Sequence, residues 1–220
     1  MLATGTASGK TLAYTIPALC AATETMGRSG CVALFLYPTK ALAQDQLGKL
    51  QAALDGVRGL DDKKILAVDG DVPHAARADI MAAPPAFIAT NPDMLHYTVL
   101  PGAGGAWSRL VQDVRYVVVD EAHVYVGAFG AHVAAVLRRF ARLRPEARFF
   151  CCSATVRDAG AHARALLPPA SRPLAVVDVD GSPRGGKQVV VWNPPYREKT
   201  PSDAKPRRGA PAWRGAPRLE

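Results

Sequence analysis

Short apolar runs alternate with longer stretches of helical periodicity through the first 180 residues, and this alternation constrains the fold most. The runs are rich in β-branched residues and carry few polar positions, which is typical of strands covered on both faces of a sheet. They span residues 31–37, 64–68, 86–89, 115–119, 148–152 and 174–177. Strands that alternate with helices in this way predict an α/β fold with three layers and a mainly parallel sheet.

Two of the intervening stretches, residues 39–54 and 129–143, show helical periodicity. In the second, we expect one apolar stripe to be buried against the sheet. Its members are Phe129, Val133, Val136, Leu137 and Phe140. A further strand is predicted over residues 188–192, before two consecutive prolines.

The composition supports a packed core, because 49% of the residues are hydrophobic and 21% are charged. The run over residues 31–37 is among the longest apolar stretches, and it has the length of a strand, so we expect no membrane span. The N-terminus lacks the charged-then-apolar order of a signal peptide. The four cysteines have no Cys-x-x-Cys spacing, which favours reduced core thiols of an intracellular protein over a zinc site or disulfides.

The net charge of +8 is concentrated at the C-terminal end. Residues 181–220 contain nine Lys and Arg against three acidic residues, and seven of the eighteen prolines. A basic, proline-rich segment with few large apolar side chains is not expected to fold by itself. We expect a solvated, disordered tail over residues 196–220; a non-specific phosphate-binding arm is the alternative.

The opening residues form a candidate phosphate-binding loop. Its glycines allow backbone N–H groups to face phosphate oxygens, and a helix would begin directly after it. Lys10 would reach the β- and γ-phosphates of ATP, and the Thr11 hydroxyl would bind Mg²⁺. A threonine replaces the first glycine of the usual pattern, and a Gly/Ser loop with an incidental lysine is the alternative. The loop comprises Thr4, Gly5, Thr6, Ala7, Ser8, Gly9, Lys10 and Thr11.

Two adjacent carboxylates, Asp120 and Glu121, follow the valine-rich run over residues 115–119. A parallel strand would deliver them to the sheet edge at which α/β proteins bind ligands. There Asp120 would hold hydrated Mg²⁺ through water, and Glu121 would orient and deprotonate the attacking water. An acidic strand-to-loop junction is the alternative, but the preceding phosphate loop favours nucleotide hydrolysis.

Small hydroxyl residues, Ser153 and Thr155, follow the run over residues 148–152. They are placed to hydrogen-bond the loop 120–123 and to sense bound nucleotide. Capping of a helix that starts near residue 156 would explain the same residues. Both interpretations stay open at this point.

Two further strand-to-helix turns carry hydroxyl, amide and charged groups. Helix N-termini beside such groups suit the backbone oxygens of a nucleic acid. Helix capping also explains the threonine of the first turn and the Asn-Pro pair of the second, and for each turn taken singly it is the favoured interpretation. The candidate nucleic-acid-binding residues are Pro38, Thr39, Lys40, Thr90, Asn91 and Asp93.

Taken together, these segments resemble the superfamily-two DEAD/DEAH-type helicases, and within them the RecQ-related Hrq/MrfA-type DNA helicases. The resemblance extends from Ala3 to about Pro195. It includes six ordered segments and three softer ones. The ordered segments are TGTASGKT, PTKALAQDQ, Asp69-Gly70-Asp71, TNPDML, DEAH and CCSAT; the softer ones are residues 129–133, 180–185 and 192–195.

This resemblance implies the first of two RecA-like motor domains, with ATP and Mg²⁺ bound at Lys10, Thr11, Asp120 and Glu121. It implies coupling roles for His123, Ser153 and Thr155. It also implies a grip on nucleic acid, either single-stranded DNA or a duplex junction, with translocation from three-prime to five-prime in genome repair. Such a protein is expected in the nucleus of a eukaryote or the cytoplasm of a bacterium, and not in a membrane.

The chain departs from that family pattern at both ends. The first strand is reduced to Met1 and Leu2, and no second motor domain with arginine fingers or cysteine-rich zinc domain follows. We therefore expect a fragment that binds ATP·Mg²⁺ weakly and does not unwind nucleic acid alone. We predict three parts. The ATP-binding domain comprises residues 1–180, an extra strand or the start of a linker to a second domain comprises residues 181–195, and the tail comprises residues 196–220.

Two other functions remain open on the sequence. One is a non-catalytic module that binds nucleotide or nucleic acid, derived from a helicase domain; the intact Lys10, Asp120 and Glu121 oppose it. The other is a small-molecule kinase, but the adjacent carboxylates favour activation of water over transfer to an acceptor.

Overall fold

The computed structural model describes residues 1–5, 8–25, 30–60, 65–154, 156–169, 173–183, 186, 189–192, 196–197 and 216–217. The chain divides into two compact units, Met1–Ser182 and Pro183–Glu220. The first unit contains the sheet and its helices. In the second, the two-residue strands β7 (Tyr196–Arg197) and β8 (Ala216–Pro217) pair in antiparallel fashion.

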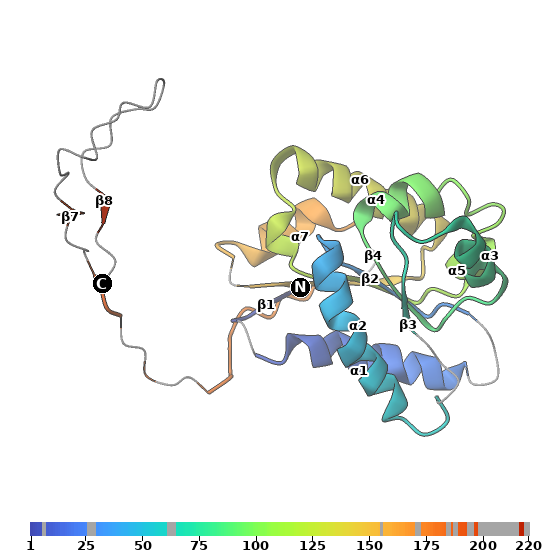
Figure 1. Cartoon of the computed structure of the whole chain (residues 1–220), viewed down its shortest axis with the longest axis horizontal. Helices are drawn as coiled ribbons and strands as arrows, with labels where there is room; N and C mark the ends of the chain where they lie inside the picture. The colour runs from blue at the N-terminus through green and yellow to red at the C-terminus, as the bar shows by residue number, and fades with distance from the viewer. Residues whose placement is uncertain are drawn as a thin grey trace. The chain divides into compact units, whose positions relative to one another are not determined.

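A six-stranded sheet forms the centre of the first unit (Figure 1), in the order β1-β6-β5-β2-β4-β3. Every neighbouring pair in it is parallel, so all of its strands end at the same edge. This confirms the predicted α/β architecture. The strands are β1 (Leu2–Ala3), β2 (Ala33–Leu36), β3 (Ile65–Ala67), β4 (Phe87–Thr90), β5 (Tyr116–Val119) and β6 (Arg148–Ser153).

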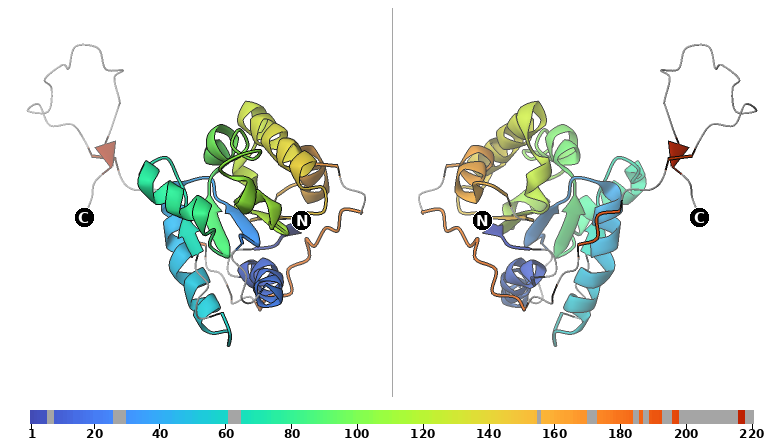
Figure 2. Two further views of the ribbon diagram at one scale, coloured as in Figure 1. Left: turned by 90° about the vertical axis from the view of Figure 1, so that its right-hand side faces the viewer. Right: turned by 90° about the vertical axis from the view of Figure 1, so that its left-hand side faces the viewer.

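Helices cover both faces of this sheet. α1 and α2 pack on one face, and the remaining helices pack on the other (Figure 2). A π-helical turn η1 (Leu95–Val99) continues α4, and a 3₁₀ turn η2 (Ala122–Val124) follows β5. The helices are α1 (Lys10–Glu24), α2 (Lys40–Asp55), α3 (His74–Ala82), α4 (Pro92–Met94), α5 (Ser108–Gln112), α6 (Gly127–Leu143) and α7 (Ala159–Leu166).

The apolar runs are continuous because their residues serve two separate cores. In β2, Leu34 and Leu36 face the core under α5, α6 and α7, whereas Ala33 and Phe35 face the core under α1 and α2. All four are 0–1% exposed. Since alternate strand residues point to opposite faces, both faces need apolar side chains.

The stripe predicted along α6 is correct except at its start. Val133, Val136, Leu137 and Phe140 are buried, but Phe129 is 42% exposed. Phe129 lies in the first turn of α6, where its ring contacts Tyr125 at a centroid distance of 5.4 Å instead of entering the core.

Glycine at position 130 lies against the backbone of Tyr125, where an added Cβ would come within 2.4 Å of a carbonyl oxygen.

Two predicted strands are not formed as expected. Of residues 174–177, Val177 makes an isolated parallel bridge to Leu2, and the segment borders β1 without becoming a full strand. The described residues 189–192 are in no strand, and Val189 and Trp192 are 84% and 68% exposed. Gln188 lies outside the described residues, as does most of the tail 196–220 for which we predicted disorder.

None of the helices in the described ranges combines the length and the apolar character that a membrane span requires. All four cysteines are free thiols, and Cys31, Cys151 and Cys152 are buried as predicted. The predicted core position was wrong for Cys20, which lies on an exposed position of α1.

Candidate functional site

The phosphate loop lies between β1 and α1, at the edge where the parallel strands end. Gly9 has a φ of 81°, in the left-handed region that favours glycine, and it turns the chain into α1. The side chains of Thr4 and Ser8 are hydrogen-bonded at 2.6 Å across the loop. Thr6 and Ala7 lie outside the described residues.

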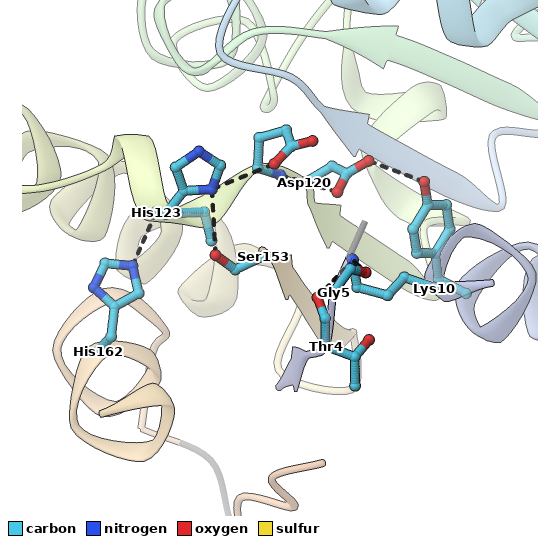
Figure 3. Close-up of polar contacts among 10 residues, drawn as sticks. Thr4, Gly5, Lys10, Asp120, His123, Ser153 and His162 are labelled. Carbon is cyan, nitrogen blue, oxygen red and sulfur yellow. Dashed lines mark hydrogen bonds and ion pairs between the residues drawn. The ribbon is translucent and has the colours of Figure 1, made fainter. Parts of the chain in front are cut away.

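The ammonium group of Lys10 is folded onto its own loop (Figure 3). Its Nζ donates to the carbonyl oxygens of Thr4 at 2.8 Å and Gly5 at 2.6 Å. Lys10 begins α1, whose N-terminus carries partial positive charge from its unpaired N–H groups. A cationic side chain and helix N–H groups form a donor set that suits a triphosphate.

Asp120 directly follows β5, beside the end of β2. Its backbone N–H donates to Leu36 O at 3.0 Å, and its Oδ1 accepts from the backbone N–H of Glu121 at 2.9 Å. Glu121 has a φ of 48°, which is costly for a residue with a Cβ. The carboxylate oxygens of Asp120 and Glu121 are of the kind that hydrated Mg²⁺ prefers.

A buried tyrosine that the sequence analysis did not select joins α1 to this carboxylate. The hydroxyl of Tyr14 donates to Oδ2 of Asp120 at 3.0 Å, and the residue is 0% exposed. The phosphate-loop helix and β5 are therefore in direct contact. Helical periodicity predicts a core residue at position 14, and no signal in the sequence indicates which carboxylate its hydroxyl would meet.

Two more buried tyrosines, Tyr37 and Tyr125, surround the same carboxylate. Burial raises the pKa of all three phenols above the ordinary value of 10.0, and the Asp120 carboxylate adds to each shift. The hydroxyls of Tyr37 and Tyr125 have no hydrogen-bond partner among the described residues. The phenols therefore stay neutral at physiological pH, and each hydroxyl keeps its proton.

The predicted contact between the loop 120–123 and the end of β6 is present (Figure 3). Nδ1 of His123 lies 3.3 Å from Ser153 Oγ and 3.3 Å from Oε2 of Glu121. Ser153 is fully buried, and the cap of α7 is Asp158, whose Oδ1 accepts from Ala161 N at 2.7 Å. The capping interpretation of Ser153 was therefore wrong, while Thr155 lies outside the described residues.

His162, which belongs to none of the sequence motifs, also supports this loop. Its Nε2 lies 2.8 Å from the carbonyl oxygen of Ala122 (Figure 3), for which it is the donor. The ring reaches from α7 to η2 and so joins that helix to the turn that follows the carboxylates. A single histidine in a helical pattern carries no signal for such a contact.

The residues predicted to bind nucleic acid cluster at the ends of β2 and β4, which are neighbours in the sheet. Thr39 caps α2 by accepting from Leu42 N at 3.3 Å, and Asn91 caps α4 by accepting from Met94 N at 2.8 Å. Pro38 is half-buried and Asp93 is exposed. The helix-capping roles proposed for the threonine and the asparagine are thus confirmed.

The remaining two members of that group differ in accessibility. Lys40 is on the surface and forms an ion pair of 2.5 Å with Asp71, which raises the pKa of Lys40. Thr90 is 3% exposed, and its hydroxyl donates to Val68 O at 2.6 Å. Its side chain therefore supports the sheet, and we leave Thr90 out of the nucleic-acid-binding group proposed below.

Comparisons with known proteins agree with this geometry. The DEAD/DEAH box helicase family matches residues 1–162. The ATP-dependent helicase hrq1 of Schizosaccharomyces pombe is 39% identical over 93% of this chain, and the ATP-dependent helicase YprA of Bacillus subtilis is 40% identical over 89%. These matches span 19% and 25% of the two relatives.

Among solved structures, the helicase MrfA bound to DNA and AMPPNP shares 40% sequence identity, with a TM-score of 0.71 over 84% of this chain and 25% of that one. Parallel strands, the phosphate loop and the acidic turn thus occur in the order and arrangement of a RecA-like helicase domain. The chain belongs to the DEAD/DEAH box helicase family.

Proposed function

We propose that this chain is the ATP-binding motor domain of a DNA helicase, in which ATP hydrolysis drives translocation along the nucleic acid. The observation that carries the proposal is the Tyr14–Asp120 hydrogen bond of 3.0 Å, because it fixes the phosphate-loop helix against the carboxylate strand. Relatives named ATP-dependent helicases, and the MrfA structure with DNA and AMPPNP, support the same function.

Within this proposal, Lys10 releases the carbonyl oxygens of Thr4 and Gly5 and turns to the β- and γ-phosphates. Thr11 and, through water, Asp120 would hold Mg²⁺, which neutralises phosphate charge when it is bound. Glu121 orients the attacking water and accepts its proton. Loop residues 4–9 would enclose the phosphates.

The proposed coupling path runs from the acidic turn to β6. His123 contacts both Glu121 and Ser153. A movement of the acidic turn on hydrolysis would therefore be transmitted to the end of β6. Exposed and half-buried groups at the ends of β2 and β4 would contact the sugar-phosphate backbone: Pro38, Thr39, Lys40, Asn91 and Asp93.

A second RecA-like domain is part of this proposal. Its arginine would stabilise charge on the transferring phosphoryl group, an effect worth roughly 10³–10⁵ in rate. We therefore expect this 220-residue chain alone to bind nucleotide but to hydrolyse it very slowly.

Nucleotide binding by the chain tests the proposal directly. Fluorescence titration with a mant-labelled, non-hydrolysable ATP analogue and Mg²⁺ should give saturable binding, weakened about tenfold or more by Lys10→Ala. The matched control is Lys49→Ala, because Lys49 pairs with Asp45 on the exposed side of α2. The proposal fails if the wild-type chain does not bind, or if both lysine variants bind equally well.

A further inference from the structure

The segment Asp180-Gly181-Ser182 has no role in the proposed chemistry, yet it lies against the phosphate loop. The chain before it runs along the free edge of β1. The N-terminal amine of Met1 donates to Ala175 O at 2.7 Å, Val177 N donates to Met1 O at 2.9 Å, and Ala3 N donates to Val177 O at 2.8 Å. This ladder carries Asp180 to the point where β1 becomes the loop.

The two carboxylate oxygens of Asp180 have different partners. Oδ2 accepts from the backbone N–H of Gly5 at 3.1 Å, across 175 residues of sequence. Oδ1 accepts from the backbone N–H of Ser182 at 3.0 Å and from its hydroxyl at 2.5 Å. The local turn thus holds the carboxylate in place while its other oxygen reaches the loop.

The carboxylate approaches Gly5 so closely that a side chain at position 5 would displace it. A Cβ built on Gly5 would lie 2.7 Å from Oδ2 of Asp180, which is closer than van der Waals contact allows. The contact with Asp180, a residue outside the phosphate loop, therefore depends on the absence of a side chain at Gly5. Gly9, by contrast, is explained by its positive φ.

Gly5 is held from both sides in this structure. Asp180 accepts from its N–H group, and Lys10 donates to its carbonyl oxygen at 2.6 Å. If Lys10 turns to a bound triphosphate, the carbonyl contact is lost and the N–H contact is retained. In the proposed complex, the N–H groups at the start of α1 would bind phosphate. Gly5 comes before these groups in the chain, so its partner Asp180 lies beside the loop and outside the position that a phosphate would occupy.

We infer that Asp180 is a positioning residue, which holds the start of the phosphate loop in the shape that receives a nucleoside triphosphate. It acts through the Gly5 N–H and does not touch the nucleotide. The inference rests on the proposed function of the loop. It gives the segment after the sheet an indirect part in nucleotide binding, through the shape of the loop.

Affinity for the mant-labelled ATP analogue with Mg²⁺ tests this role in the full chain. Asp180→Ala should weaken binding about tenfold, as expected for loss of a hydrogen bond to a charged acceptor. Asp178→Ala is the matched control, because Asp178 is an exposed carboxylate two residues away. Unchanged affinity in Asp180→Ala would overturn the inference, and so would tighter binding, which would show that the carboxylate competes with phosphate.

A double variant separates positioning from a general loss of stability. Gly5→Ala should weaken binding because its methyl group clashes with the Asp180 carboxylate. In Gly5→Ala/Asp180→Ala that clash is removed, so affinity should be no lower than in Asp180→Ala alone. Two fully additive losses would contradict the inference.

Amide hydrogen exchange at Gly5 gives a readout that needs no nucleotide. The Gly5 amide should be protected in the wild type and in Asp178→Ala, and should exchange rapidly in Asp180→Ala. Equal exchange in all three proteins overturns the positioning role whatever the binding result. A wild-type chain that fails to bind nucleotide would instead overturn the proposed function, so the two failures are distinguishable.

Discussion

The hydroxyl of Tyr14 donates a hydrogen bond of 3.0 Å to Oδ2 of Asp120, across 106 residues of sequence. Tyr14 lies one turn into the helix that Lys10 begins, and Asp120 lies at the end of β5. One buried side chain thus connects the two segments whose proximity the nucleotide site requires. Its contact orients the carboxylate before any nucleotide is bound.

Removal of this hydroxyl should lower stability. In Tyr14→Phe, the Asp120 carboxylate loses a donor in a partly buried position, which we expect to cost about 1–2 kcal/mol in the free energy of unfolding. Urea unfolding at neutral pH measures the change. Tyr97→Phe is the control, because Tyr97 is 71% exposed. Equal stabilities of the two variants would show that the Tyr14 contact contributes nothing.

The contact of His162 with the acidic turn leads to a second expectation. His162→Ala leaves the carbonyl oxygen of Ala122 without its side-chain donor and should lower the free energy of unfolding by about 1 kcal/mol. His162→Gln should restore part of the loss, since its amide is also a donor. Arg164→Ala, an exposed change on the same helix, should have little effect. A loss in Arg164→Ala as large as in His162→Ala would contradict this account.

Cysteine reactivity should follow burial. Burial raises the pKa of Cys151 to about 12 and raises the pKa of Cys31 and Cys152 as well, so these thiols stay protonated at about pH 8. Cys20 is exposed. Titration of the folded chain with a thiol-specific chromophore should show one fast group and three slow ones, and all four should react quickly in denaturant. Fast reaction of all four thiols in the folded chain would be inconsistent with the buried positions.

The same buried acids predict a pH dependence of stability. The unfolded chain releases thiol and phenol protons near their ordinary pKa values of 9.0 and 10.0, whereas the folded chain retains them. The contribution of these groups to the free energy of unfolding should therefore be fully present below about pH 8.5 and decrease as the pH rises above it. Urea unfolding over that range measures the slope.

Tyrosine variants identify which groups cause that decrease. Tyr125→Phe removes one buried phenol with a raised pKa and should make the decrease shallower. Tyr97→Phe removes an exposed phenol and should leave the slope unchanged. A free energy of unfolding that rises with pH would reverse the expected sign.

Much of the sheet could be predicted from local sequence, and so could two parts of the site, the phosphate loop and the acidic pair. A strand covered on both faces needs an unbroken apolar run, so residues 31–37 and 115–119 indicated β2 and β5 directly. The phosphate loop and the acidic pair are adjacent to those patterns in sequence. Parallel strands then bring their ends to one edge, which is why these residues could be grouped before the structure was known.

The supporting contacts could not be predicted in the same way. Tyr14 and Asp120 are 106 residues apart, His162 and Ala122 are 40 apart, and Gly5 and Asp180 are 175 apart. Each is a polar contact set by tertiary packing, and periodicity reports only that a side chain faces inward. Phe129 shows the same limit at the start of α6. The apolar pattern includes this position, but the hydrophobic core does not extend to the first turn of the helix.

The central claim is that the phosphate loop and Asp120 hold one Mg²⁺-bound triphosphate between them. Its most direct test is the Mg²⁺ dependence of ATP-analogue affinity in the wild type and in Asp120→Asn. We predict that Mg²⁺ tightens binding to the wild type, and that Asp120→Asn removes this gain while its affinity in excess chelator stays at the wild-type level. An equal gain from Mg²⁺ in both proteins would contradict the claim.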